Sequence, residues 1–299
     1  SRRQRQMCIR DSSCTVRLNE LMSGHTSFKI GGPADILVLP ESIEQLREVL
    51  KVVKETVVPL TLLGNGSNVL VRDKGIRGIV IKLGNMLRHF YEAEDLLVFG
   101  SGYSLALASY KAMECGKTGM EFAVGIPGSI GGAVYMNAGA YDGEMQNIVN
   151  CVKVMDLQGN ERVLTAEELN FGYRKTSLQN SGLIVTEVTL KMPSGNKDEI
   201  KSKMDDFSHR RISKQPLEMP SAGSMFKRPP GYFAGTLIDQ AGLKGYTVGG
   251  AQISTKHAGF VVNVGGATAA DVLQLIKDVQ TKIKAGVGVC LLYTSDAAD

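Results

Sequence analysis

The stretch Gly125-Ile-Pro-Gly-Ser-Ile-Gly-Gly-Ala-Val-Tyr-Met-Asn-Ala-Gly-Ala-Tyr141 decides how we interpret the rest of this 299-residue chain. Its glycines and proline disfavour a regular helix or strand across the first half of the stretch, and its small side chains let backbone N–H groups approach a ligand closely. Consecutive amides of this kind form concave sites for anions. The stretch therefore predicts a phosphate-binding loop, with a tightly packed turn as the alternative.

A second glycine cluster, Leu63-Gly-Asn-Gly-Ser-Asn-Val-Leu-Val71, has the same character. Two such loops in one chain suggest one large ligand that carries several phosphates. Neither a P-loop nor a Rossmann fingerprint accounts for them. Lys111 occupies the first glycine position of the P-loop pattern that ends at Thr118, and Val69 stands where the dinucleotide fingerprint needs a small residue. We therefore expect any dinucleotide to bind without a Rossmann fold.

The composition excludes several classes of protein. A hydrophobic fraction of 43% is normal for a soluble chain with a sizeable core, and no apolar run has the length of a membrane span. A net charge of +4 favours small anionic ligands over nucleic acid. The five cysteines include no CxxC pair, and the four histidines show no metal spacing, so we expect thiols in a reducing cytoplasm and no metal site.

Hydrophobic periodicity predicts an α+β chain. Helices are expected after the capping residues Ser42 and Thr268, over residues 104–115, and over the charged segment 197–211. Apolar or alternating runs predict strands over 35–40, 59–63, 69–71, 78–83, 96–100, 149–157, 161–164, 183–192 and 259–264.

Taken together, these segments resemble the UDP-N-acetylenolpyruvoylglucosamine reductases, in their shorter second type. The resemblance runs from about residue 18 to residue 289 and rests on motifs in the family's order, namely residues 26–34, 64–71, 125–141, 171–177, 221–229 and 249–263. It implies a two-lobed FAD-binding fold of the vanillyl-alcohol-oxidase type, followed by a C-terminal α/β substrate domain. We place the lobes at 14–83 and 84–195 and the substrate domain at 196–289.

The resemblance also implies the reaction, which is reduction of UDP-N-acetylglucosamine enolpyruvate to UDP-N-acetylmuramate for peptidoglycan synthesis. NADPH is the implied electron donor, FAD the cofactor, and a cytoplasmic monomer the expected form. The residues that it assigns to FAD are Gly64, Asn65, Gly66, Ser67, Asn68, Gly125, Pro127, Gly128, Ser129, Gly131, Gly132, Asn137, Ala138 and Gly139.

Two residues match the family's catalytic motifs. Arg174 is the candidate cation for the charge that develops on the substrate carboxylate, although an arginine in such a loop can also form a surface ion pair. Ser224 matches the proton-donating serine, and its alternative role is that of a turn or capping residue. Arg211, Lys227 and Arg228 are candidate partners of the sugar-nucleotide diphosphate, or else solvated surface charges.

The chain departs from the family near its end. Family members continue into a Leu-Glu-Pro-Glu-Val segment that supplies a third catalytic residue, whereas here Val289 is followed by Cys290-Leu-Leu-Tyr293 and no glutamate occurs after Glu218. We expect residues 1–13 and 290–299 to be foreign, the final strand to be lost, and turnover to be reduced. Two alternatives stay open: a flavin- or UDP-sugar-binding protein without turnover, and another FAD oxidoreductase of the same fold.

Overall fold

The computed structural model describes residues 14–84, 86–293 and 296–298. They form two compact units, and the chain passes between them several times. The first unit contains residues up to Arg17, Ile36–Asn65 and Gly78–Arg210, and the second contains Leu18–Asp35, Gly66–Arg77 and the residues from Arg211 onward. The expected division of this part of the chain into lobes at 14–83 and 84–195 stays a prediction.

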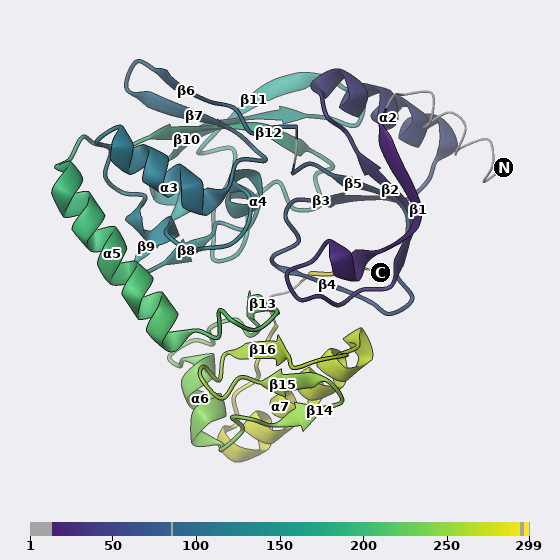
Figure 1. Ribbon diagram of the computed structural model, residues 1–299, viewed down its shortest axis with the longest axis vertical. Coiled ribbons are helices and arrows are strands. Elements are labelled where there is room, and N and C mark those ends of the chain that lie inside the picture. Colours follow the sequence, from purple (N-terminus) through teal and green to yellow (C-terminus); the bar gives the residue numbers. More distant parts are fainter. Residues whose placement is uncertain (1–13, 85, 294–295, 299) are drawn as a thin grey trace. The chain divides into compact units, whose positions relative to one another are not determined.

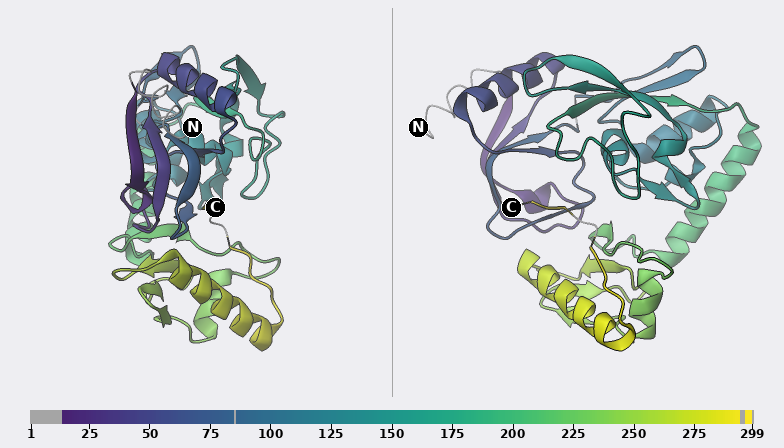
Figure 2. Two further views of the ribbon diagram at one scale, coloured as in Figure 1. Left: turned by 90° about the vertical axis from the view of Figure 1, so that its right-hand side faces the viewer. Right: turned by 180° about the vertical axis from the view of Figure 1, so that it is seen from behind.

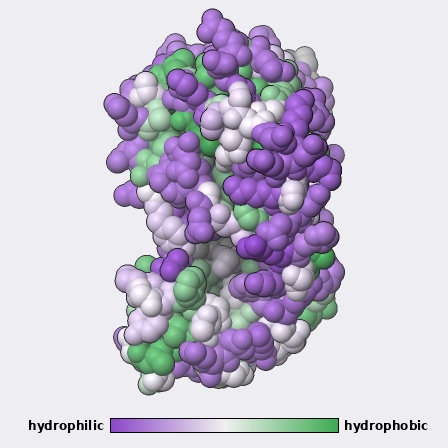
Figure 3. Space-filling view, turned by 90° about the vertical axis from the view of Figure 1, so that its left-hand side faces the viewer, coloured by the Kyte–Doolittle hydropathy of each residue, from purple (hydrophilic) through white to green (hydrophobic). Residues whose placement is uncertain are grey.

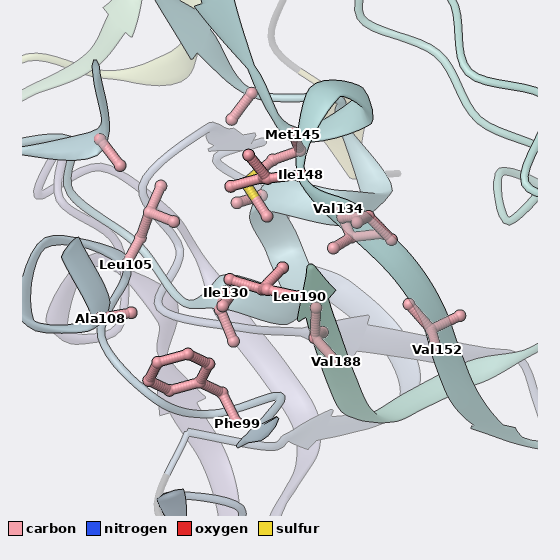
Figure 4. Close-up of a cluster of buried hydrophobic side chains, with 14 of the residues drawn as sticks. Phe99, Leu105, Ala108, Ile130, Val134, Met145, Ile148, Val152, Val188 and Leu190 are labelled. Carbon is pink, nitrogen blue, oxygen red and sulfur yellow. The ribbon is translucent and has the colours of Figure 1, made fainter. Parts of the chain in front are cut away.

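The centre of the first unit is a five-stranded antiparallel sheet in the order β11-β10-β12-β7-β6 (Figure 1). Its strands are β6 (Phe90–Ala93), β7 (Leu96–Gly100), β10 (Val149–Met155), β11 (Glu161–Thr165) and β12 (Ile184–Lys191). Helices α3 (Leu105–Glu114) and α4 (Ile130–Tyr135) contribute Leu105, Ile130 and Val134 to the apolar cluster that covers this sheet (Figure 4). The predicted hairpin of β10 and β11 is confirmed by their antiparallel pairing.

A second sheet has the strand order β1-β2-β5-β3. It consists of β1 (Thr15–Leu21), β2 (Pro33–Leu39), β3 (Leu60–Leu63) and β5 (Ile76–Lys82), with α2 (Ile43–Thr56) following β2. The Oγ of Ser42 accepts the Gln45 N–H at 3.1 Å, as a helix cap does. Four buried side chains of α2 pack against the apolar residues of β2 and β5, namely Leu46, Val49, Leu50 and Val53.

The charged helix predicted over 197–211 is α5 (Lys197–Lys214). Its apolar residues Ile200, Met204 and Phe207 are buried and pack with Val124 of the first unit. The chain leaves the first unit near Arg211, beyond residue 196, where we expected the substrate domain to begin. The sequence suggested that a new unit begins with this helix. Its three-residue apolar stripe instead packs most of the helix against the unit that precedes it.

The second unit contains an antiparallel sheet in the order β13-β16-β15-β14. Its strands are β13 (Ser221–Ser224), β14 (Thr247–Val248), β15 (Ala251–Ile253) and β16 (Phe260–Asn263), and its helices are α6 (Ala234–Gln240) and α7 (Ala269–Val287). Figure 2 shows α7 lying along this sheet, where its apolar face is buried. The predicted cap of α7 is a complete capping box, in which Thr268 and Asp271 satisfy each other's backbone N–H groups.

Strand β4 (Val69–Val71) of the second unit pairs in parallel with β17 (Asp296–Ala298). The C-terminal segment thus contains a short strand of its own, while the expectation that residues 290–299 replace the family's final strand stays a prediction. Hydrogen bonds of a β-ladder join backbone groups, so an edge strand can pair with segments of many sequences.

The remaining short elements are the strands β8 (Gly139–Ala140) and β9 (Gly143–Glu144) and the 3-10 turns η1 (Met22–Gly24), η2 (Glu121–Ala123) and η3 (Met145–Asn147). Hydrophilic residues predominate on the face shown in Figure 3, with hydrophobic residues in small groups among them. Among the residues that the structure describes, no helix is long and apolar enough to cross a bilayer, and no group of His, Cys, Asp and Glu has the arrangement of a metal site.

Candidate functional site

The glycine-rich stretch contains a short helix where we expected irregular backbone. Helix α4 begins at Ile130, so Gly131 and Gly132 are helical. Ser129 makes this possible because its Oγ accepts the Gly132 N–H at 3.3 Å and caps the helix. Before the helix, Gly125 and Gly128 have φ values of 72° and 125°, in the region that favours glycine.

Gly131 and Gly132 are small for different reasons. A Cβ on Gly131 would lie 2.7 Å from the Cβ of Ser101 and 3.0 Å from its carbonyl oxygen, so Gly131 is required by packing inside the protein. Gly132 is exposed, and a Cβ there would meet only the Ser129 Oγ, at 3.3 Å. The absence of a side chain at Gly132 therefore leaves the backbone open on the solvent side.

Within the first unit, the two glycine loops meet. A Cβ on Gly64 would lie 2.9 Å from the Ser129 Oγ. The amides of Gly64, Asn65, Gly128 and Ser129 donate no hydrogen bond to another described residue. Free N–H groups at closely approaching glycines suit the oxygens of a diphosphate, so this part of the chain fits the pyrophosphate of FAD.

Within the glycine cluster Leu63–Val71, the residues from Gly66 onward belong to the second unit. Gly66 has a φ of 67°, and a Cβ there would lie 2.3 Å from the His25 carbonyl oxygen, so packing within that unit requires this glycine. Ser67 and Asn68 are partly buried and lead into β4. Their assignment to FAD, and that of Gly66 and Pro127, rests on the resemblance alone.

Asn137, Ala138 and Gly139 make contacts inside the protein. The Asn137 side chain is 3% exposed, its Nδ2 donates to Glu144 Oε2 and to the Gly172 carbonyl at 3.1 Å each, and its Oδ1 accepts the Gln146 N–H at 3.0 Å. Ala138 belongs to the buried cluster, and a Cβ on Gly139 would lie 2.7 Å from the Gly143 carbonyl oxygen. The Asn137 amide therefore joins the glycine-rich stretch to the loop that carries Arg174.

Arg174 lies at the tip of a tight turn. The backbones of Gly172 and Lys175 exchange N–H···O bonds of 2.9 and 3.1 Å, which leaves Tyr173 and Arg174 between them. Arg174 has a φ of 56°, a conformation that costs a residue with a Cβ about 1 kcal/mol or more. The buried Thr176 hydroxyl donates to the Tyr135 carbonyl at 2.8 Å, so the loop is attached to the end of α4.

Ser224 ends β13 in the second unit, and its side chain is exposed. The next residue, Met225, donates its N–H to the Gly259 carbonyl at 2.8 Å, and a Cβ on Gly259 would lie 3.4 Å from the Ser224 Oγ. The same Cβ would lie 3.0 Å from the ring of His257, whose Nδ1 accepts the Gly259 N–H at 3.0 Å. Burial lowers the pKa of His257, and Lys244 and Lys214 lower it further, so the acceptor nitrogen is unprotonated at neutral pH.

The three predicted diphosphate partners have different environments in the second unit. Arg211 is buried and donates from Nη1 to Gln215 Oε1 at 3.2 Å. The Lys227 backbone N–H donates to the Leu292 carbonyl at 2.6 Å, and its side chain is partly buried. The Arg228 guanidinium stacks on the exposed ring of Phe233, 4.0 Å from its centroid, as a cation–π pair.

Sequence reasoning missed the buried carboxylate of Glu121, which precedes the glycine-rich stretch. It accepts hydrogen bonds from Thr118 Oγ1 at 2.6 Å and from the Gly119 N–H at 2.8 Å. Burial opposes its ionisation, but these hydrogen bonds and Lys203 outweigh burial and lower its pKa. The sequence signal for it is a glutamate three residues after a threonine, because a carboxylate at this spacing can accept hydrogen bonds from the hydroxyl and from a nearby backbone amide.

Comparison with known proteins gives consistent matches over nearly the whole chain. Residues 34–165 match the model of an FAD binding domain, and residues 215–293 match that of the C-terminal domain of UDP-N-acetylenolpyruvoylglucosamine reductase. The reductase of that name from Clostridioides difficile is 49% identical over 276 residues, which are 92% of this chain and 91% of the relative. The one from Clostridium perfringens is 52% identical over 269 residues, 90% of this chain and 88% of the relative.

A solved structure gives the same result. The crystal structure of UDP-N-acetylenolpyruvylglucosamine reductase from Thermus caldophilus aligns with a TM-score of 0.81 at 38% sequence identity, over 96% of this chain and 99% of that one.

Proposed function

The chain belongs to the UDP-N-acetylenolpyruvoylglucosamine reductase family, and on that premise we propose which of its residues carry the reaction. The family membership makes it an FAD-dependent oxidoreductase that reduces the enolpyruvyl C=C bond of UDP-N-acetylglucosamine enolpyruvate with electrons from NADPH, in peptidoglycan synthesis. The fold, activity and cofactor predicted from the sequence are thereby confirmed. The assignment of individual residues is a proposal.

FAD, when bound, supplies the hydride carrier between NADPH and the substrate double bond. We propose that the amides of Gly64, Asn65, Gly128 and Ser129 hold its diphosphate. The observation that supports this is the close approach of the two loops, where a Cβ on Gly64 would lie 2.9 Å from the Ser129 Oγ, together with amides that bond to no other described residue. Backbone N–H groups at such a site bind anionic oxygen without adding a competing charge.

Arg174 carries the electrostatic part of the proposed mechanism. Hydride addition at C3 of the enolpyruvyl group places negative charge on C2 and on the adjacent carboxylate. A guanidinium is permanently charged, and its forked N–H groups match a carboxylate or enediolate, so it lowers the energy of the transition state more than that of the ground state. The strained φ of Arg174 agrees with a functional role, because strained backbone accumulates at active sites.

Ser224 supplies the proton that C2 then requires. Its hydroxyl is exposed at the end of β13, where a ligand has access to it. An isolated serine is a weak acid, so the proton transfer depends on the charge that accumulates on C2 and on nearby groups that stabilise the alkoxide. We propose Arg211, Lys227 and Arg228 as partners of the substrate diphosphate.

An anaerobic two-stage experiment tests these assignments. The bound flavin is reduced with NADPH, and its reoxidation by UDP-N-acetylglucosamine enolpyruvate is followed at the flavin absorbance maximum. We expect Arg174→Ala and Ser224→Ala to slow reoxidation at least 100-fold, with little change in flavin reduction. The matched controls are Lys175→Ala, which removes a cation next to Arg174, and Ser221→Ala, which removes a hydroxyl from the same strand as Ser224. A wild-type rate of reoxidation in Arg174→Ala or Ser224→Ala would remove that residue from the mechanism.

A second candidate function is flavin and sugar-nucleotide binding without turnover, which the replaced C-terminal motif favours. We propose that Cys290-Leu-Leu-Tyr293, in place of the family's glutamate-containing segment, severely reduces turnover while FAD binding is retained or weakened. Replacing residues 290–293 and those after them by a family-like Leu-Glu-Pro-Glu-Val segment is expected to raise steady-state turnover. An unchanged rate would show that this acid does not limit the chain.

We also propose that the enzyme acts as a cytoplasmic monomer that binds neither nucleic acid nor membranes. The net charge of +4 and the absence of a membrane-spanning helix among the described residues agree with this proposal. Light scattering coupled to size-exclusion chromatography tests it, because a molar mass above 32.2 kDa by an integer factor would contradict a monomer.

A further inference from the structure

The conformation of Arg174 needs support from its surroundings. Position 174 is the third residue of the tight turn from Gly172 to Lys175 and has a φ of 56°, where glycine or asparagine is usual. A side chain with a Cβ stays in this region only when neighbouring groups hold the backbone there. The contacts of the turn therefore decide where the guanidinium of Arg174 is presented.

Gln179 holds one end of this turn. Its Nε2 donates to the Arg174 carbonyl at 3.1 Å, so it bonds to the strained residue itself. The same nitrogen lies 3.4 Å from the Tyr135 carbonyl and 3.6 Å from the Met136 Sδ, both at the end of α4. One amide thus connects the backbone of Arg174 with the helix that follows the glycine-rich stretch.

Asn137 holds the other end. Its Nδ2 donates to the carbonyl of Gly172, the first residue of the turn, at 3.1 Å, while Glu144 and the Gln146 N–H engage the rest of the amide. Only a side chain that both donates and accepts hydrogen bonds satisfies this set of partners, which explains an amide at a buried position. Asn137 itself has a φ of 42°, which asparagine tolerates better than most residues.

We propose that Gln179 and Asn137 are positioning residues for the reductive step, which hold the turn of Arg174 to the end of α4. This inference rests on the role proposed above for Arg174. It assigns Asn137 a function toward Arg174 and not toward the flavin. It also explains why two amide side chains, 42 positions apart in the sequence, bond to the same turn.

The decisive variant is Gln179→Met, which keeps the length of the side chain and removes the donor without adding charge. In the FAD-bound enzyme we expect flavin reoxidation by the enolpyruvyl substrate to slow about tenfold, while flavin reduction by NADPH changes less than about twofold. Ser177→Ala is the matched control, because it removes a hydrogen bond from the same loop to the Glu168 carbonyl, and it should leave both rates unchanged.

A double-variant comparison separates positioning from a general loss of structure. If Gln179 acts through Arg174, Gln179→Met adds no further slowing in the Arg174→Ala background. Wild-type reoxidation in Gln179→Met, or full additivity with Arg174→Ala, would overturn the inference. Wild-type reoxidation in Arg174→Ala alone would instead refute the catalytic role of Arg174 and leave the hydrogen-bonding description in place.

Asn137→Ser provides the second test, because a hydroxyl can still donate and accept but cannot reach all three partners. We expect the same selective slowing of reoxidation with the flavin spectrum retained. If Asn137→Ser loses flavin, the assignment is decided by Gln179→Met, because the Gln179 amide bonds to the turn of Arg174 and to the end of α4.

Discussion

Replacement of Gly131 by alanine tests how α4 supports the proposed diphosphate site. The new Cβ would lie 2.7 Å from the Cβ of Ser101 and 3.0 Å from its carbonyl oxygen. That oxygen already accepts the Gly131 N–H at 2.9 Å. Helix α4 therefore cannot move away from Ser101, which follows β7, without stretching this hydrogen bond. Gly132, the next residue, is the control, because its Cβ would meet only the Ser129 Oγ at 3.3 Å.

The two substitutions should have opposite effects on the free energy of unfolding. Overpacking of a buried site costs about 1–3 kcal/mol, whereas alanine in place of helical glycine contributes about 1 kcal/mol. Gly131→Ala is therefore expected to lose up to about 2 kcal/mol. Gly132→Ala is expected to gain between ~0 and ~1 kcal/mol, since the exposed side chain strains only a hydroxyl that can rotate.

Urea denaturation at several FAD concentrations separates stability from cofactor affinity, because the increase in stability with ligand concentration reports the dissociation constant. We expect Gly131→Ala to lower the stability extrapolated to zero FAD. Gly132→Ala should keep or slightly raise that value but bind FAD at least roughly tenfold more weakly, as its Cβ obstructs the proposed diphosphate. Unchanged stability of Gly131→Ala, or wild-type FAD affinity of Gly132→Ala, would refute the corresponding part of this reasoning.

Three further predictions concern the second unit. Asp73→Ala should destabilise the protein by about 1 kcal/mol in thermal denaturation, because the carboxylate accepts two N–H groups at the start of α7, at 2.8 and 2.9 Å; an unchanged melting temperature would contradict this. The pKa of His257 is lowered in the folded state, so the unfolded chain binds a proton first as the pH falls below 6.5 and the free energy of unfolding declines there. His257→Asn should remove that part of the decline. Gly259→Ala, with a Cβ 3.0 Å from the His257 ring and 3.4 Å from the Ser224 Oγ, should slow substrate-driven flavin reoxidation more than NADPH-driven reduction, and equal slowing of both steps would argue against a local effect.

Local features of the sequence were sufficient for the elements whose signals lie within a few residues. Thr268 and Asp271 cap α7 three residues apart, and Ser42 caps α2 in the same way, so both helix starts were predictable. The start of α4 inside the glycine-rich stretch was missed because capping by Ser129 outweighed the low helix propensity of Gly131 and Gly132.

The candidate site depended more on partners that are distant in the sequence. The sequence identified Arg174 through its motif, but its support by Gln179 and by Asn137 follows from a turn that folds back on α4. The pairing of β17 with β4 joins segments more than 200 residues apart. Such contacts have no local signature, because backbone hydrogen bonds between strands do not depend on side-chain identity.

Sequence by itself determined the family and the cofactor, because glycine spacing, capping residues and motif order are properties of short segments. Only the tertiary structure decided what each of these glycines and amides does. Gly131 packs against Ser101 and Gly132 faces solvent, while the Asn137 side chain donates a hydrogen bond to the turn of Arg174. The physical reason is that a small or amide side chain is compatible with several roles. Its neighbours in space, and not those in sequence, select one of them.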